Sequence, residues 1–161
     1  MHKKIKIISN SPNQTLKIGN TIAEKLKAGD IVCLFGELGS GKTQLAKGML
    51  SYFDVSVDSV NSPSFVLLKQ YPLKQINLNH FDLFRLEKEK DILAIGFLEY
   101  VYSTDISIIE WADRLKTNLP NEFVGIELKI IGEDKRQINL FSKGERYLGL
   151  VKILNDEHFS N

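Results

Sequence analysis

A glycine-rich segment followed by a lysine and a threonine offers the chemistry of phosphate binding. It consists of Gly36, Glu37, Leu38, Gly39, Ser40, Gly41, Lys42 and Thr43, and it matches the pattern G-x-x-x-x-G-K-[ST] at every position. Phosphate oxygens need several donors that converge on one point, and a loop with inward-facing backbone N–H groups supplies them. We expect Lys42, facing solvent from this loop, to reach the β- and γ-phosphates and the Thr43 hydroxyl to ligate Mg²⁺. The segment therefore predicts a site for a nucleoside triphosphate and magnesium.

Two acidic residues are candidates to complete such a site. Glu110 follows the apolar run 106–109, and Asp82 follows the run 76–81. Because ligands bind at the carboxyl ends of the strands in open α/β sheets, either carboxylate could face the phosphates. We assign Glu110 to the metal and Asp82 to orienting or deprotonating the attacking water, a role that acids play in phosphoryl transfer. The alternatives are that each acid caps the helix that follows it, with Asp82 paired to Arg85.

Other residues near these acids have both a functional and a structural interpretation. His80 precedes Asp82 by two positions and is better explained as a hydrogen-bonded residue beneath the site than as a catalytic one. Trp111 either packs against its neighbours or stacks beside the nucleotide. The segment Ser62-Pro63-Ser64-Phe65 is either a plain loop or a switch whose hydroxyl, on Ser64, contacts metal or phosphate when ATP is present.

The elements around the motif have the order that a phosphate loop requires. The apolar run 31–35 predicts a strand covered on both faces, and helical spacing of apolar residues follows the loop. Ser11 and Pro12 begin a helix that we expect to end at Gly29. Further strands are expected at 4–8, 64–71, 76–81 and 106–109, with an antiparallel pair at 124–131 and 137–141 and a helix at about 85–95. This pattern predicts an α/β, P-loop NTPase-like three-layer fold with a mostly parallel central sheet and antiparallel edge strands.

Length and composition limit the classes of protein to consider. A chain of 161 residues is the length of one domain, and we expect residues 1–154 to form it and 155–161 to be a frayed tail. Of 21 basic residues 17 are lysines scattered along the chain, which disfavours nucleic acid as a direct substrate. Cys33 is the only cysteine, and the chain has neither a signal-peptide pattern nor an apolar run long enough for a membrane helix. We therefore expect a cytoplasmic protein without a membrane partner.

Absent motifs narrow the choice of nucleotide and reaction. No Asn-Lys-x-Asp guanine signature occurs in the sequence, which favours ATP over GTP. The four arginines, at positions 85, 114, 136 and 146, do not cluster in one segment as they do in the lid of a small-metabolite kinase. A partner-regulated ATPase is the leading hypothesis. A small-metabolite kinase and a nucleotide-dependent binding module without meaningful hydrolysis are the alternatives.

Five motifs in register resemble the TsaE (YjeE) family of bacterial ATPases. Beyond the phosphate loop, they are Ser62–Phe65, His80–Leu86, Gly96–Tyr100 and Ile109–Trp111, and the resemblance spans about residues 10–145. One position departs from the family, which usually has threonine where this chain has Ser64. The hydroxyl is retained, so ligation should survive.

This resemblance implies a function in tRNA modification. Members of the family are required to make N6-threonylcarbamoyladenosine (t6A) at position 37 of tRNA, and they act with the TsaB–TsaD heterodimer. The resemblance implies that ATP hydrolysis is weak in the isolated protein and depends on these partners, and that tRNA is reached only indirectly through the complex. By motif, Lys42 and Thr43 hold phosphate and Mg²⁺, Asp82 serves hydrolysis, Glu110 serves the metal, and Trp111 lies beside the nucleotide.

Overall fold

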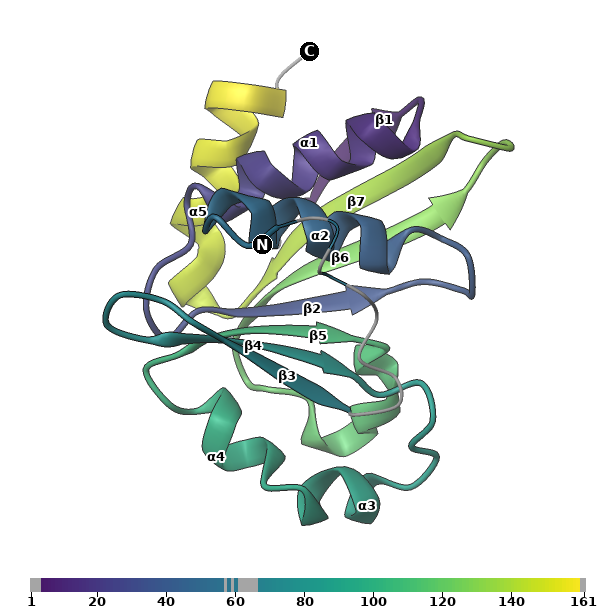
Figure 1. The fold of residues 1–161 in the computed structure, drawn as a ribbon. Coiled ribbons are helices and arrows are strands. Elements are labelled where there is room, and N and C mark those ends of the chain that lie inside the picture. Colours follow the sequence, from purple (N-terminus) through teal and green to yellow (C-terminus); the bar gives the residue numbers. More distant parts are fainter. Residues whose placement is uncertain (1–3, 57, 59, 61–66, 160–161) are drawn as a thin grey trace.

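A seven-stranded sheet forms the centre of the molecule (Figure 1). The computed structural model describes residues 4–56, 58, 60 and 67–159. Its strands are β1 (Lys4–Ser9), β2 (Ile31–Phe35), β3 (Leu68–Pro72), β4 (Asn77–Asp82), β5 (Ile106–Glu110), β6 (Phe123–Ile130) and β7 (Arg136–Lys143). They lie in the order β1-β7-β6-β2-β5-β4-β3.

The central part of the sheet is parallel and its edges are antiparallel, as predicted. β2 pairs in parallel with both β5 and β6, and β4 pairs in parallel with β5. The pairs β1–β7, β6–β7 and β3–β4 are antiparallel. β2 and β5 are almost entirely buried, which explains their continuous apolar sequence. The carboxyl ends of β4, β5, β2 and β6 therefore meet along one edge of the sheet.

Helices cover both faces of the sheet and give the expected three layers (Figure 1). One face packs against α1 (Pro12–Ala23), α2 (Lys42–Tyr52) and α5 (Leu148–Leu154). The other packs against α3 (Glu89–Ala94), α4 (Phe97–Val101) and the 3₁₀ helix η2 (Ala112–Asn118). The 3₁₀ turn η3 (Glu145–Tyr147) connects β7 to α5. No helix among the described residues combines the length and the apolar character needed to cross a bilayer.

The start of α1 follows the sequence signal, whereas its end does not. The Ser11 hydroxyl accepts a hydrogen bond from the Gln14 backbone N–H at 3.0 Å, and the Gln14 side chain accepts one from the Asn10 N–H at 2.7 Å. The first bond is a Ser11 cap at the predicted helix start; the second resembles a capping box but reaches Asn10, the residue before the cap, and not Ser11 itself. The helix ends at Ala23 and not at Gly29, because the chain then tightens into turns that the Asp30 carboxylate closes by accepting from the Lys27 N–H at 2.9 Å.

Two further element predictions were wrong. The helix expected at about 85–95 is shortened to α3, because the chain from Asp82 forms turns first: the Asp82 carboxylate accepts from the Phe84 N–H, and the Leu86 N–H bonds to the Leu83 carbonyl. The tail expected to fray instead continues α5 as a turn of π-helix, Asn155–Phe159. A Lys25–Glu157 ion pair at 2.7 Å and packing of Phe159 on the core hold this turn in place. Of the strand predicted at 64–71, residues 64–66 lie outside the described part of the chain.

Candidate nucleotide-binding site

The glycine-rich loop connects the end of β2 to the start of α2 and curves in a way that excludes larger residues. Gly36 and Gly41 have φ values of 149° and 102°. A Cβ atom on Gly36 would lie 2.5 Å from the Ser40 hydroxyl and 2.7 Å from the Leu128 carbonyl oxygen. Side chains at these positions would open the curve, so the loop keeps its shape only with glycine there.

Lys42 points back over this loop. Its ammonium group donates hydrogen bonds to the carbonyls of Gly36 at 2.6 Å and Glu37 at 2.9 Å, and it lies 4.0 Å from the centroid of the Trp111 ring. The side chain is only 5% exposed, so the expectation of a solvent-facing lysine is wrong: the loop carbonyls and the indole enclose it. Burial lowers the pKa of Lys42, while the nearby carboxylates of Glu110 and Asp82 act in the opposite direction. An anion that binds beside this buried ammonium group would stabilise its charged form.

Glu110 joins the loop helix to the strand beside it. One carboxylate oxygen accepts from the Thr43 hydroxyl at 2.7 Å, and the other lies 2.6 Å from Nε2 of His80. Glu110 and His80 are both buried. Nδ1 of His80 has no hydrogen-bond partner among the described residues, and a bare acceptor costs less there than an unpaired N–H, so we place the proton on Nε2. His80 thus supports Glu110 from below, as the sequence predicted.

Asp82 lies next to Glu110 at the same edge of the sheet. The parallel register of β4 and β5 pairs the two residues directly, so their side chains point to the same face. Asp82 is 3% exposed and its carboxylate accepts from the Phe84 backbone N–H at 2.9 Å. Asp82 does not cap the helix that follows it, because α3 begins only at Glu89; its carboxylate caps a turn instead, and this contact coexists with a position at the site.

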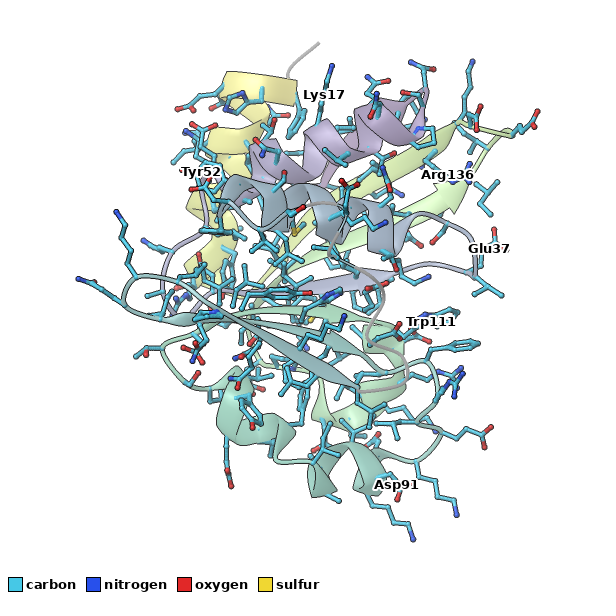
Figure 2. All side chains as sticks on the ribbon, in the orientation of Figure 1. Lys17, Glu37, Tyr52, Asp91, Trp111 and Arg136 are labelled. Carbon is cyan, nitrogen blue, oxygen red and sulfur yellow. The ribbon has the colours of Figure 1, made fainter. Side chains whose placement is uncertain are left out.

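A cavity of about 410 Å³ brings these residues together. The residues that line it are Leu38, Gly39, Gly41, Lys42, Thr43, Gln44, Asp82, Phe84, Glu110 and Trp111. Of the other residues singled out from the sequence, Gly36, Glu37 and Ser40 shape the loop without lining this cavity, and Ser64 lies outside the described residues. Figure 2 shows Glu37 at the outer edge of the loop and Trp111 below it. Phe84 and Gln44 were not predicted to contribute.

Trp111 forms one wall of the cavity in an unusual backbone conformation. Its φ of 57° lies in the left-handed region, which few residues other than glycine adopt. The ring packs against Phe84, with centroids 4.9 Å apart, and lies against the Lys42 ammonium. The indole therefore packs against its neighbours and also faces the cavity, and stacking beside the nucleotide stays a prediction.

The oxygen donors in the cavity fit Mg²⁺ better than a metal held by protein alone. Among the described residues no group of three or more His, Cys, Asp or Glu side chains is placed to hold a metal. Mg²⁺ usually takes one or two protein oxygens and completes its shell with phosphates and water. The Thr43 hydroxyl and the Glu110 carboxylate are such donors, 2.7 Å apart at the cavity wall.

Arg136, at the start of β7, also contacts the loop, although no motif in the sequence predicts this contact. Its Nε donates to the Ser40 carbonyl and its Nη2 to the Gly39 carbonyl, both at 3.1 Å. Figure 2 shows Arg136 on the opposite side of the loop from Trp111. The contact joins residues almost a hundred positions apart, so no local pattern could have revealed it.

Comparison with known proteins agrees with this geometry. The family described as "Threonylcarbamoyl adenosine biosynthesis protein TsaE" matches residues 9–138. The chain is 34% identical to the tRNA threonylcarbamoyladenosine biosynthesis protein TsaE of Bacillus subtilis, over 95% of each chain. It is 35% identical to the TsaE of Rickettsia bellii, over 83% of this chain and 92% of the relative.

The fold is shared with a solved structure. The crystal structure of Bacillus subtilis YdiB superposes with a TM-score of 0.83 at 29% sequence identity, and the match covers 97% of each chain. The phosphate loop and both acidic strand ends fall within the residues that the family match covers. The chain belongs to the TsaE family.

Proposed function

We propose that this chain is an ATP-binding and ATP-hydrolysing protein required for t6A modification of tRNA, acting with the TsaB–TsaD complex. One observation carries the proposal: Lys42, Thr43, Asp82 and Glu110 line a single cavity beneath a glycine loop. Relatives that the chain matches over most of its length are named as t6A biosynthesis proteins. Localisation in the cytoplasm, where tRNA is modified, is part of the proposal.

Each of these residues has a defined task in the proposed hydrolysis. The backbone N–H groups of the loop and the start of α2 bind phosphate oxygens, and Lys42 exchanges its carbonyl partners for the β- and γ-phosphates. Thr43 and Glu110 hold Mg²⁺, which supplies neutralisation of phosphate charge when bound. Asp82 is placed beside Glu110 to orient or deprotonate the attacking water.

Phosphate release is the direct measurement. We expect slow release of inorganic phosphate from MgATP by the purified protein and faster release when TsaB and TsaD are added. Asp82→Asn should bind MgATP with nearly wild-type affinity but release phosphate at least about 100-fold more slowly, since general-base catalysis is worth about 10²–10⁴-fold. Release by Asp82→Asn at the wild-type rate would remove Asp82 from the chemistry.

Two further experiments separate the alternative functions. With γ-labelled ATP and a mixture of cell metabolites, a labelled product other than inorganic phosphate would favour a kinase. Full t6A formation in cells that carry only Asp82→Asn would favour a nucleotide-dependent binding module. Absence of MgATP binding, alone and with TsaB–TsaD, would contradict the whole proposal.

A further inference from the structure

The two faces of the sheet are covered unequally by helices. Successive side chains of β1, β7 and β6 point to opposite faces, and the row with Ile5, Leu140 and Ile126 packs against α1, α2 and α5. The alternate residues point to the face that carries α3, α4 and η2. Figure 1 shows α3 and α4 at the β3–β4 side of the sheet, far from β7. The β6–β7–β1 half of this face is therefore open, and its exposed lysines are Lys4, Lys6, Lys129 and Lys143.

A groove of about 500 Å³ lies on this open half of the sheet. Its lining residues are Lys4, Phe35, Glu127 and Phe141. The Phe141 ring extends across β6 above Gly125, where a Cβ atom would lie 2.2 Å from the Cζ atom of the ring. Phe35 stacks beside this ring with centroids 6.2 Å apart, and Phe123 packs against it at 6.3 Å. The three phenylalanines therefore form a continuous apolar floor.

The border of the groove is positively charged. Of its four exposed lysines, only Lys129 forms an ion pair with another described residue, with Glu127 at 3.6 Å. Glu127, the one acid that lines the groove, also accepts a hydrogen bond from the Asn139 amide at 3.1 Å. Its charge is therefore already engaged, whereas the ammonium groups of Lys4, Lys6 and Lys143 are left to attract carboxylates.

We propose that the groove binds an amphipathic helix of a partner protein, with the apolar stripe of the helix on the phenylalanine floor and its acidic residues beside the lysines. Such a helix would complete the layer that α3, α4 and η2 form on the other half of this face. β6 and β7 each have eight residues and span about 26 Å, which matches a helix of about 18 residues. None of the groove residues lines the nucleotide cavity, so this surface is separate from the proposed active site.

The packing of the rings favours a helix over single-stranded nucleic acid. Bases stack on free ring faces, but Phe123 is only 3% exposed and the three rings contact one another. The Glu127 carboxylate on the floor would also repel a phosphate backbone.

Fluorescence anisotropy with designed peptides tests this proposal. The probe is a dye-labelled helical peptide of about 18 residues, with leucines at i, i+3, i+4 and i+7 and glutamates beside this stripe. The full chain should bind it saturably and at least about tenfold more tightly than the same peptide with lysine in place of glutamate. Lys4→Glu combined with Lys6→Glu should weaken binding about tenfold, and so should Phe141→Ala, which removes part of the floor. Lys17→Glu combined with Lys27→Glu makes the same change of charge at exposed positions outside the groove, and it should alter the affinity less than about twofold.

Several outcomes would overturn the helix site. They are failure of the wild type to bind the acidic peptide, equal binding of the acidic and basic peptides, and wild-type affinity in the variant with both groove lysines reversed. Tighter binding of a single-stranded oligoribonucleotide that displaces the peptide would assign the groove to nucleic acid instead. Dimerisation in sedimentation velocity that the same variants abolish would assign it to a second copy of the chain. Thermal melting checks folding, and because Lys4 and Lys6 are exposed, their variant decides the question even if Phe141→Ala unfolds.

Discussion

Glu110 is shared between the Thr43 hydroxyl above it and the His80 ring below it, which fixes both of its oxygens. We expect Glu110→Gln to keep the fold, because the amide oxygen can still accept from Nε2 of His80 while the amide nitrogen donates to the Thr43 hydroxyl. The binding of Mg²⁺ should weaken, because the variant lacks the negative charge of the carboxylate. Phosphate release should fall about 10- to 100-fold, as for other changes next to a metal, and the Mg²⁺ concentration for half-maximal rate should rise. Glu127→Gln on β6 is the control. If Glu110→Gln had the same Mg²⁺ dependence as the wild type, Glu110 would have no role in binding the metal.

Lys42 is a buried cation whose ammonium group is held by loop carbonyls and lies against an indole. Lys42→Met keeps the unbranched stem and removes the charge, so we expect a melting temperature near that of the wild type. ATP affinity should fall about 10- to 100-fold, because hydrogen bonds to charged groups are worth about 1.5–3 kcal/mol. Calorimetry measures the ATP affinity of the wild type and of Lys42→Met, with Lys47→Met on the same helix as control. ATP affinity equal to that of the wild type would contradict the assignment of Lys42.

At the scale of elements, α1 and α2 touch through glycines. A Cβ on Gly48 of α2 would lie 1.9 Å from the Leu16 carbonyl oxygen, and one on Gly19 of α1 would lie 2.3 Å from that of Leu45. Gly48→Ala must push the helices apart, and we expect it to lower the free energy of unfolding by about 2–3 kcal/mol. Gly149→Ala in α5, where a Cβ meets nothing within 4 Å, should be neutral or stabilise by about 0.5 kcal/mol. Urea denaturation measures the free energy of unfolding of Gly48→Ala and Gly149→Ala. Equal values for the two variants would contradict the close contact between α1 and α2.

At this scale, the elements that could be predicted from the sequence are those that depend on local motifs or on the periodic spacing of apolar residues. The apolar runs of β2 and β5, the Ser11 cap of α1 and the acids at the strand ends are signals that depend on neighbours a few positions away. The helix expected at 85–95 failed because the Asp82 side chain bonds to the Phe84 N–H, and a charged stretch with helical composition does not reveal such a turn. Arg136 was missed because its partners, Gly39 and Ser40, are adjacent only after β6 and β7 join the sheet.

At the scale of the whole molecule, the C-terminal segment closes the fold onto its central strand. The Tyr147 hydroxyl accepts a hydrogen bond from the Ile31 backbone N–H at 2.9 Å, and Arg146 forms an ion pair with buried Asp30 at 2.9 Å. Both contacts lie at the start of β2, at the opposite end of that strand from the phosphate loop. Anchoring α5 here keeps the C-terminal segment away from the site.

The anchor predicts how stability depends on pH. Burial raises the pKa of Tyr147 to about 12 from its ordinary value of about 10, so the folded state holds this proton more tightly than the unfolded state. The corresponding stability is complete below pH 10 and disappears as the pH rises toward 12. At pH 11 the loss should be about 1.4 kcal/mol.

Tyr147→Phe isolates this contribution, because phenylalanine has no hydroxyl that could titrate. Near pH 8 it should cost about 1–3 kcal/mol, since the buried Ile31 N–H loses its acceptor. By pH 11 that cost should shrink by about 1.4 kcal/mol, as the wild type loses its own advantage. Urea denaturation at both pH values measures the difference, with Tyr102→Phe, at a side chain 58% exposed, as control. A penalty for Tyr147→Phe that is the same at pH 8 and pH 11 would show that the hydroxyl carries no raised pKa, and the buried anchor would then need another explanation.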